Sequence, residues 1–360
     1  MGTIERFQEE VRAAARERRP LCIRGSGSKD WYGGQPHGAI LDTREYAGIV
    51  DYEPTELVIT ARCGTPLAEI EALLARHNQM LAFEPPCFGP NATLGGTVAA
   101  GLCGPRRATS GATRDFVLGA RLLDGKGDVL SFGGKVMKNV AGYDVSRMLA
   151  GSLGTLGLLL EVSLKVLPRP FAETTLRFGM GEIEAIRRLN EWGGQPLPLS
   201  GSAWCDGVLA LRLSGAEAAV DAAVRRLGGE TLPDAAAFWA DLREQRHPFF
   251  ADAGANATPL WRLSVPSTTG ALVLGGGQLI EWGGAQRWLR ARGDAATAQD
   301  IRRTAQACGG HATLFRGGDK TVGVFQPLAP ALARIHARMK DAFDPARIYN
   351  PGRLVPDNPS

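Results

Sequence analysis

Residues 85–104 read PPCFGPNATLGGTVAAGLCG, and this stretch carries little side-chain bulk for its length. A buried strand or helix would need large apolar groups here to fill space. Glycine instead allows positive φ and lets a ligand approach the main chain. Backbone N–H groups exposed on such a loop form a concave anion site, and a helix beginning there would add its positive dipole end. A turn packed closely against a neighbouring segment is the alternative interpretation.

Another glycine-rich loop lies upstream; we call it the first loop, since it comes earlier in the chain, and the one that contains residues 93–97 the second loop. Residues 21–23 (LCI) are expected to form a short buried strand, and residues 24–29 (RGSGSK) follow it directly. This loop combines backbone donors, two hydroxyl groups and a cation at each end, which suits a diphosphate. One charge-assisted hydrogen bond contributes about 1.5–3 kcal/mol, whereas nanomolar binding requires about 12 kcal/mol. Two loops closing on one ligand could reach this value. Neither loop has the Gly-x-Gly-x-x-Gly spacing of a Rossmann site.

Four blocks in this order resemble the FAD-binding domain of the vanillyl-alcohol oxidase and p-cresol methylhydroxylase family of flavoproteins. They are RGSGSK at 24–29, TLGGTVAAGLCGP at 93–105, DFVLGARLLDGKGDVL at 115–130 and NVAGYDVSRMLAGSLGTLGLLLEVSLKVLP at 139–168. The resemblance covers roughly the first half of the chain. The length and the segments PLWRLSVP (259–266) and FDPARIYNPGRL (343–354) make the whole sequence similar to the E subunits of bacterial glycolate oxidases.

The resemblance implies an α+β fold, with a two-subdomain FAD-binding domain of the vanillyl-alcohol oxidase type and an α+β cap domain. We place the FAD-binding domain at 1–170, because residues 168–170 (PRP) interrupt the pattern. The cap or substrate domain is expected at 171–325, and a C-terminal segment at 326–360 is expected to return to the FAD domain. Apolar periodicity predicts helices at 3–18, 139–150, 182–190 and 216–226, strands at 207–213 and 270–274, and a hairpin turn at 124–127.

The resemblance also implies FAD-binding residues, most of them in the two loops. The backbone at Gly151, Gly157 and Val162 is expected at the adenine end, and Asn350 near the ring system. The full set of expected cofactor-binding residues is Arg24, Gly25, Ser26, Gly27, Ser28, Lys29, Pro86, Thr93, Leu94, Gly95, Gly96, Thr97, Gly101, Gly104, Gly111, Arg114, Asp115, Gly151, Gly157, Val162 and Asn350. FAD is expected to bind non-covalently, because the first loop has no histidine for a covalent link.

Oxidation of a 2-hydroxy acid by a flavin needs a group that binds the carboxylate and a base for the hydroxyl proton. Arg262, in an otherwise apolar segment, is the candidate for bidentate binding of the carboxylate; an ion pair within the cap is the alternative. The resemblance places Tyr143 near the flavin, although it could instead be an ordinary packed tyrosine. His247 is a further candidate base.

Relatives that are complete 2-hydroxy-acid dehydrogenases carry a metal-binding segment His-x-Gly-Asp-Gly-Asn-x-His and a further Glu-His pair. Near the matching place, residues 310–320 read GHATLFRGGDK and contain only His311. A lone histidine is more often packed or exposed than a ligand. We therefore expect no metal site, which argues against catalysis by this chain alone.

The composition bounds the remaining possibilities. The chain has 360 residues, which suggests about two domains. Its net charge of +4 is spread along the chain, and no nucleic-acid partner is expected. No apolar run reaches the roughly eighteen residues of a transmembrane helix, and the start MGTIERFQEE does not look like a secretory signal. The six cysteines are scattered without a Cys-x-x-Cys pair, so the usual zinc and iron–sulfur spacings are absent.

The resemblance implies that the chain is an FAD-binding subunit of a glycolate (2-hydroxy-acid) oxidase complex. The expected partners are a small 2-hydroxy-acid substrate, a larger flavoprotein subunit and an iron–sulfur subunit, since the chain has no second redox centre of its own. A cytoplasmic location is expected, with attachment to the inner face of the membrane through partners as an alternative. A self-sufficient FAD dehydrogenase or oxidase of another hydroxy acid or alcohol, and a non-catalytic electron-relay subunit, remain open, as do the acid and the electron acceptor.

Overall fold

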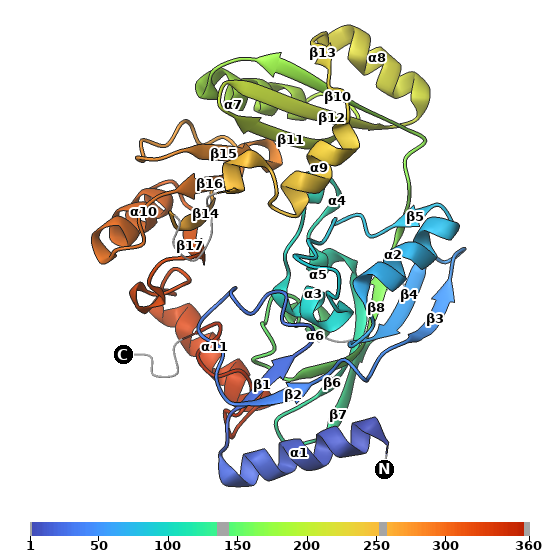
Figure 1. Ribbon diagram of the computed structural model, residues 1–360, viewed down its shortest axis with the longest axis vertical. Coiled ribbons are helices and arrows are strands. Elements are labelled where there is room, and N and C mark those ends of the chain that lie inside the picture. The colour runs from blue at the N-terminus through green and yellow to red at the C-terminus, as the bar shows by residue number, and fades with distance from the viewer. Residues whose placement is uncertain (1, 135–143, 252–257, 356–360) are drawn as a thin grey trace.

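The computed structural model describes residues 2–134, 144–251 and 258–355. The chain forms an N-terminal part, drawn below in Figure 1, and a cap drawn above it. The cap begins with strand β10 after the chain leaves β9 at Pro168. Helix α11 (Pro330–Phe343) follows the cap and leads back to the N-terminal part. The cofactor cleft described below lies in the N-terminal part, on the side that the cap faces.

The N-terminal part opens with an amphipathic helix and a small parallel sheet. Helix α1 (Thr3–Glu17) buries Phe7, Val11 and Ala14 on one face and ends with Arg18 in the left-handed region. Strands β1 (Leu21–Arg24) and β2 (Ala39–Asp42) pair in parallel, with Leu21 opposite Ala39. The glycine-rich loop at 25–29 leaves the end of β1, so the strand fixes where that loop begins.

A five-stranded antiparallel sheet forms the second subdomain, in the order β3-β4-β8-β6-β7. Its strands are β3 (Ile49–Glu53), β4 (Val58–Arg62), β6 (Val117–Leu123), β7 (Val129–Gly133) and β8 (Leu158–Lys165). The expected turn at 124–127 joins β6 to β7, because the Asp124 carboxylate accepts hydrogen bonds from the N–H groups of Lys126 and Asp128. The central strand β8 is apolar on one face, with Leu158, Leu160, Val162 and Leu164, while its other face carries Glu161, Ser163 and Lys165.

Short helices cover this sheet and share one core with α1. They are α2 (Leu67–Arg76), α3 (Leu94–Ala100), α5 (Thr113–Phe116) and α6 (Val145–Met148). Helix α4 (Arg107–Ser110) has no buried residue and lies against the cap instead. A two-stranded pair joins β5 (Gln79–Met80) to β9 (Leu167–Pro168). The core includes Phe7 of α1, Ile70 of α2, Val98 of α3 and Leu160 of β8, all at most 1% exposed. The glycines of α3 let this helix lie close to the sheet: a Cβ on Gly95 would lie 2.7 Å from the Cβ of Cys63.

The cap is one eight-stranded antiparallel sheet in the order β13-β10-β12-β11-β15-β16-β14-β17. Its strands are β10 (Ala172–Gly179), β11 (Leu199–Cys205), β12 (Val208–Gly215), β13 (Glu230–Thr231), β14 (Leu260–Ser264), β15 (Gln278–Glu281), β16 (Gln286–Arg290) and β17 (His311–Arg316). Its longer helices are α7 (Glu182–Gly193), α8 (Glu217–Leu227), α9 (Ala235–Arg243) and α10 (Ala295–Ala307), and single 3-10 turns lie at Pro248–Phe250, Trp282–Gly284 and Lys320–Val322.

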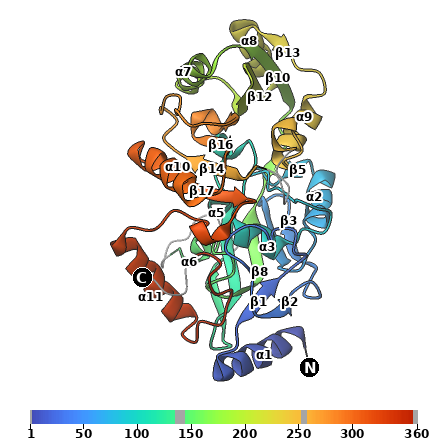
Figure 2. The same ribbon diagram turned by 60° about the vertical axis from the view of Figure 1, so that its left-hand side comes forward.

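The two faces of the cap sheet have different partners. Helices α7, α8 and α10 pack on the outer face, where Trp192, Val220 and Ile301 are buried against strand residues. The inner face packs on the N-terminal part: Trp288 and Phe315 share one apolar cluster with Tyr32 and Leu153. Figure 2 shows the same arrangement from another side, with the cap above the sheet of the N-terminal part. Any ligand held between the two parts therefore meets the inner face of the cap sheet.

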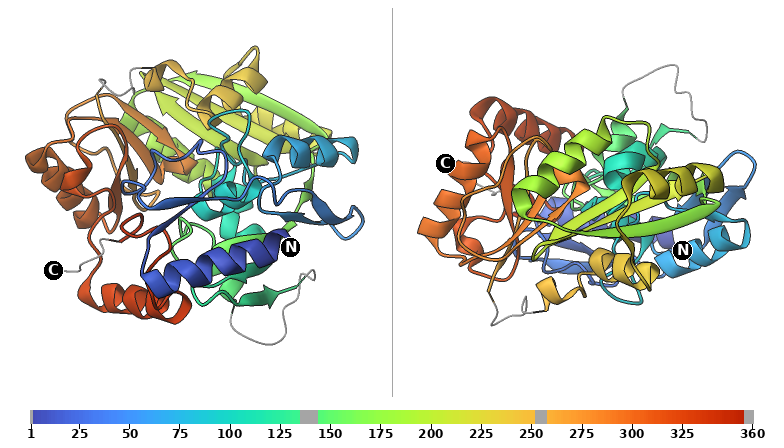
Figure 3. Two further views of the ribbon diagram at one scale, coloured as in Figure 1. Left: turned by 60° about the horizontal axis from the view of Figure 1, so that its bottom comes forward. Right: turned by 90° about the horizontal axis from the view of Figure 1, so that it is seen from above.

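The C-terminal segment returns to the N-terminal part, as the left view of Figure 3 shows. Tyr349 forms a parallel bridge with Leu21 of β1, and its phenol donates to the carbonyls of Leu123 and Asp124. The fully buried Asp344 carboxylate accepts from the N–H groups of Ile348 and Tyr349, and Lys340 donates to it at 2.6 Å. These contacts bring Asn350 beside the strand from which the first glycine-rich loop leaves.

The expected α+β class is confirmed, and two local expectations need correction. Residues 270–274 form no strand: the neighbouring glycines at 275–277 add no side-chain packing, and Val273 is 99% exposed. Within the described residues the helix expected at 139–150 is only the single turn α6, because Asp144, with a ψ of 64°, is not helical and the turn begins after it. Residues 139–143 lie outside the described residues.

Candidate functional site

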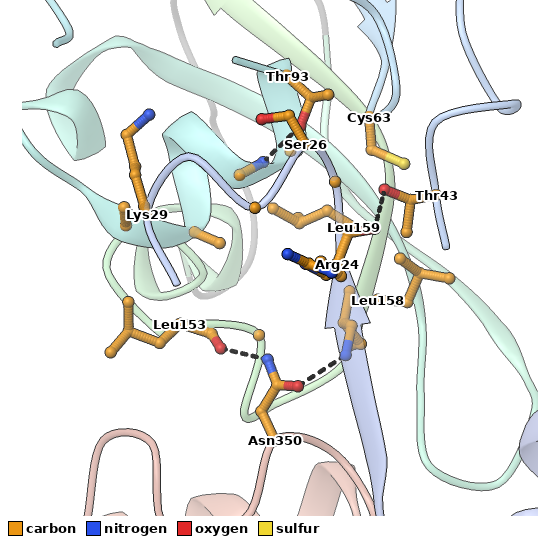
Figure 4. A pocket seen from close by; sticks show the side chains of 18 of the residues that line it. Arg24, Ser26, Lys29, Thr43, Cys63, Thr93, Leu153, Leu158, Leu159 and Asn350 are labelled. Atoms are coloured by element: carbon orange, nitrogen blue, oxygen red, sulfur yellow. Dashed lines mark hydrogen bonds between the residues drawn. The ribbon is translucent and has the colours of Figure 1, made fainter. Parts of the chain in front are cut away.

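A cleft with about 730 Å³ of atom-free space, part of it open to solvent, lies where the two glycine-rich loops meet. Three segments that are distant in sequence form most of its wall: 23–30, 93–100 and 153–159. Figure 4 shows Arg24, Ser26, Lys29, Thr93 and Asn350 around this space.

The first loop presents free backbone donors to the cleft. Within the described residues, the N–H groups of Gly25, Ser26 and Gly27 donate to no protein acceptor, although the neighbouring N–H of Ser28 bonds the Ser26 hydroxyl. Gly27 has a φ of 78°, a conformation that side chains disfavour. Consecutive unpaired N–H groups in a turn form an anion-binding nest. The arrangement suits a phosphate.

The second loop leads into α3, whose N-terminus is capped at the cleft. The Thr93 hydroxyl accepts from the N–H of Gly96, while the N–H groups of Leu94 and Gly95 bond carbonyls of Thr65 and Cys63. The two loops touch, because a Cβ on Gly25 would lie within 2.3 Å of the Thr93 hydroxyl. Gly25 is therefore needed for close packing of the loops, and Gly96 is the exposed glycine of the second loop.

Two cations of the first loop lie in a partly buried setting. Arg24 pairs with Asp30 at 2.7 Å, yet its buried Nε has no partner among the described residues. Lys29 donates to the carbonyl of Cys87, and burial lowers its pKa to about 8, an effect that Cys87 and Glu244 oppose. An anionic ligand would supply the missing acceptor for Arg24 and would favour the charged form of Lys29. The residues present thus fit the pyrophosphate of FAD.

Asn350 ties three segments together at one end of the cleft. Its Nδ2 donates to the carbonyl of Leu153 at 2.6 Å, and its Oδ1 accepts from the N–H of Ile23 at 2.7 Å (Figure 4). Its own N–H bonds the carbonyl of Leu21. The C-terminal segment therefore shapes the cleft through a side chain expected there from the sequence.

All the residues expected from the first loop line the cleft, whereas several residues expected from other segments do not. The expected residues that line it are Arg24, Gly25, Ser26, Gly27, Ser28, Lys29, Thr93, Gly95, Gly96, Gly157 and Asn350. Pro86 and Gly104 instead line a second cavity, and Gly151 lines a third one beside α11. Leu94, Thr97 and Val162 are at most 1% exposed. Gly101 ends α3 with a left-handed backbone conformation and packs against Gly151. Gly111, Arg114 and Asp115 lie together in a further segment, where the Asp115 carboxylate accepts a hydrogen bond from the N–H of Ala112.

Other cleft residues are not among those expected from the sequence. They are Ile23, Asp30, Thr43, Cys63, Ala99, Ala100, Leu153, Gly154, Leu158, Leu159 and Arg353. Arg353 donates to the carbonyls of Asp30 and Gly34 and so holds the far side of the first loop. Leu158 and Leu159 begin β8, and only the pairing of that strand brings them to the cleft. Gly154 has a positive φ, 69°, as Gly27 of the first loop does. Of these residues, it is the one that the sequence could have indicated, because it lies in a glycine-rich run.

The second cavity lies between the N-terminal part and the inner face of the cap sheet. It contains about 320 Å³ of atom-free space, part of it open to solvent, and Arg262 lies in its wall. The Arg262 guanidinium donates to the Tyr32 hydroxyl at 3.1 Å and lies 5.2 Å from the centre of the Phe315 ring. It forms no ion pair with any described residue, so the cap ion pair considered as an alternative is not present there. Tyr143 lies outside the described residues.

The two histidines considered from the sequence lie elsewhere. The His247 ring accepts from the N–H of Phe249 at the start of a 3-10 turn, and burial lowers its pKa. His311 begins β17, with its pKa lowered by burial and by Arg262. Among the described residues, no three His, Cys, Asp or Glu side chains gather as a metal site would require. No described helix has both the length and the apolarity to cross a bilayer.

Comparison with known proteins defines the class. A family model described as an FAD binding domain matches residues 1–133. The solved structure of p-cresol methylhydroxylase with substrate bound aligns with a TM-score of 0.72 over 100% of this chain and 89% of that chain, at 15% identity. An alkyldihydroxyacetonephosphate synthase aligns with a TM-score of 0.66 over 96% and 74% of the two chains, at 14% identity. The fold is therefore that of the p-cresol methylhydroxylase-type flavoproteins.

Sequence relatives narrow the class further. The glycolate oxidase subunit GlcE of Escherichia coli is 51% identical over 96% of this chain and 95% of its own length. The glycolate oxidase subunit GlcD of Bacillus subtilis is 32% identical, over 44% of this chain and 34% of its own length. The chain belongs to the family of GlcE-type glycolate oxidase subunits. It is an FAD-dependent oxidoreductase subunit, and FAD is its cofactor.

Proposed function

We propose that this chain, as the FAD-binding E-type subunit of its complex, takes part in the oxidation of glycolate to glyoxylate. The observation that carries the proposal is the unpaired guanidinium of Arg262 in the cavity between the cap and the cofactor part. This half-buried guanidinium has no acidic partner among the described residues, so it is available to an anionic ligand. A guanidinium binds a carboxylate through two parallel hydrogen bonds. Its place therefore fits the carboxylate of a small 2-hydroxy acid.

The cleft and the second cavity would hold different molecules, the cofactor and the substrate. The loops at 24–29 and 93–97 would hold the pyrophosphate of FAD, and Asn350 would fix the end of the cleft near the ring system. When bound, FAD supplies the acceptor for the two electrons and the hydrogen of the carbinol carbon. Arg262 orients the acid, and the aromatic cluster of Tyr32, Trp288 and Phe315 keeps water from the space around it. Tyr143 stays a candidate that the described residues do not include.

The proposed partners follow from what the chain lacks. The described residues contain no metal-site cluster, and the sequence has no cysteine spacing for an iron–sulfur centre. We infer a larger flavoprotein subunit that shares substrate capture and an iron–sulfur subunit that receives the electrons. The assembly would lie in the cytoplasm, and contact with the inner face of the membrane would come through those partners.

An anaerobic titration of the purified FAD-loaded chain with glycolate, alone and then with its co-purified partners, tests the proposal. We expect bleaching of the flavin absorbance by glycolate in the assembled complex and its loss in the Arg262→Met variant of this chain within that complex. Bleaching and steady turnover by the isolated chain would instead favour a self-sufficient oxidase. If the flavin of this chain stays oxidised in the complex with every 2-hydroxy acid tried, and is reduced only through the partner's cofactor, the chain is an electron relay.

A further inference from the structure

A buried carboxyl group lies on the same face of the cap sheet as Arg262. In the register of the sheet, Arg262 of β14 is opposite Trp288 of β16, and Trp288 is opposite Leu279 of β15. Glu281 follows Leu279 by two residues, so its side chain leaves the sheet on the same face. Arg262, Trp288 and Glu281 all line the second cavity. A cation and an acid thus flank one tryptophan beneath the cap.

The contacts of Glu281 leave one oxygen available. Oε2 accepts from the indole N–H of Trp288 at 2.6 Å and from the amide of Gln286 at 3.0 Å. Oε1 accepts no hydrogen bond from the described residues. Two donors on one oxygen hold the carboxyl group in a fixed orientation, and the other oxygen remains free for a ligand in the cavity.

A second polar group in the same wall also lacks a partner. The Oε1 of Gln245, at the end of α9, is buried and has no hydrogen-bond partner within the part of the chain that the structure describes. Such a group costs about 1–3 kcal/mol unless it is bonded. Gln245 and Glu281 both line the cavity that contains Arg262. The cavity therefore requires an occupant that carries a hydrogen-bond donor as well as a negative charge.

The electrostatic surroundings tune Glu281. Burial raises the pKa of Glu281 to about 7, and the negative charge of Glu84 adds to this rise. The hydrogen bonds from Trp288 and Gln286 and the positive charge of Arg212 of β12 lower the pKa and so oppose the rise. Arg262 of β14 and Arg243 of α9 are the other charged groups that line the cavity. No cation pairs with Glu281 among the described residues. A carboxyl group titrating near neutral pH accepts and returns a proton efficiently there.

We propose that Glu281 accepts the hydroxyl proton of the 2-hydroxy acid that Arg262 binds. This inference rests on the proposed function. The O–H proton passes to the Glu281 carboxylate, the carbinol C–H bond breaks, and its hydrogen leaves with the electron pair to the oxidant, FAD. The C–O bond becomes the carbonyl of a 2-oxo acid, so atoms and charge balance.

The first test measures binding, independently of turnover. Oxamate, an unreactive monoanionic carboxylate, is titrated calorimetrically into the FAD-loaded complex from about pH 5.5 to about 8.5. For the wild type we expect the affinity to fall about tenfold per pH unit above about 7, because an ionised Glu281 then repels the ligand. Glu281→Gln should bind oxamate as tightly at all these pH values as the wild type binds it at low pH.

The controls separate the possible failures. Glu182, on the outer face of the cap, also has its pKa raised by burial, so Glu182→Gln should keep the wild-type pH dependence. If Glu281→Gln keeps that dependence too, the inference about Glu281 is wrong while the proposed function stands. If the wild-type complex binds no oxamate at any pH, or if Arg262→Met binds it as tightly as the wild type does, the proposed substrate site fails as well.

Turnover gives a second readout. We expect Glu281→Gln to lower kcat at least about 100-fold with unchanged oxamate affinity at low pH, and Glu281→Asp to recover part of the rate. Equal kcat in the Glu281→Gln and wild-type complexes would exclude proton transfer to this group. Flavin content and thermal unfolding of each variant show whether the fold is kept.

Discussion

The amide nitrogen of Asn350 donates a hydrogen bond to the carbonyl of Leu153 at 2.6 Å, although 197 residues separate them. Because Asn350 also bonds the N–H of Ile23, one side chain near the C-terminal end of the described residues connects two walls of the FAD cleft. A cofactor site of this kind forms only after the chain has returned from the cap. Cofactor binding and docking of the C-terminal segment should therefore be thermodynamically linked.

Asn350→Ala should weaken FAD binding. The change leaves the Leu153 carbonyl and the Ile23 N–H without partners, at about 1–3 kcal/mol for each group. Asn190→Ala is a matched control, since the Asn190 side chain also bonds two main-chain groups, the carbonyls of Ile186 and Ser267, but within the cap. We expect similar losses of unfolding free energy, measured in urea, and a loss of flavin affinity only for Asn350→Ala. Equal flavin affinity in both variants would show that Asn350 does not shape the site.

Gly96→Val should give a folded protein with little bound flavin. A Cβ at Gly96 meets only the Thr93 hydroxyl, at 3.3 Å, so the added side chain extends into the cleft without an internal clash. Gly179→Val, where a Cβ meets nothing within 4 Å, is the control at a distant position of the cap. Circular dichroism and the ratio of flavin to protein absorbance check both variants. Full flavin occupancy in Gly96→Val would mean that the ligand does not approach this loop.

Stability should fall with rising pH because of Glu281. The pKa of this carboxyl group is about 7 in the fold against 4.5 in the reference state, so the folded protein binds more protons between these values. The shift corresponds to about 3 kcal/mol of unfolding free energy that is present at low pH and lost as the pH rises to about 7. Urea unfolding of the wild type minus that of Glu281→Gln, at about pH 5 and about pH 8, isolates this contribution. A difference that does not change with pH would contradict the assigned titration.

Arg212→Met should strongly destabilise the contact between the two parts. Arg212 of the cap is 3% exposed and donates to Glu84 of the N-terminal part at 3.0 Å. Arg106 of the N-terminal part donates to Glu84 as well and to Glu173 of β10 in the cap. Removing one member of a buried ionic network costs about 3–5 kcal/mol. Arg177→Met, which removes an exposed ion pair with Glu230, should cost less than about 1 kcal/mol. Comparable unfolding free energies for the two variants would show that the network contributes little.

The sequence predicted the parts of the site that depend on local chemistry. A glycine at positive φ, such as Gly27, has requirements that are visible in a few neighbouring residues. The first loop was therefore predicted as a phosphate site before any long-range contact was known. Leu94 and Thr97 were expected at the cofactor only through the family resemblance, and in α3 both side chains point into the core.

Other parts of the site depend on strand register and could not be predicted. Glu281 stands in the segment GQLIEWGG, which contains no motif, and its relation to Arg262 arises only when β15, β16 and β14 pair. Arg353 reaches the first loop because Tyr349 pairs with Leu21. The prediction of a strand at 270–274 was wrong because strand formation also depends on pairing. These residues have local β-propensity, but no neighbouring strand pairs with them.

Acid precipitation of the purified protein tests the central claim most directly. The unpaired N–H groups of the first loop and its lack of histidine predict one FAD per chain, released intact into the supernatant and identified by chromatography. Release of FMN would contradict the pyrophosphate site, and flavin retained in the precipitate would contradict non-covalent binding. A folded chain that holds no flavin and takes up none when FAD is added would contradict the account as a whole.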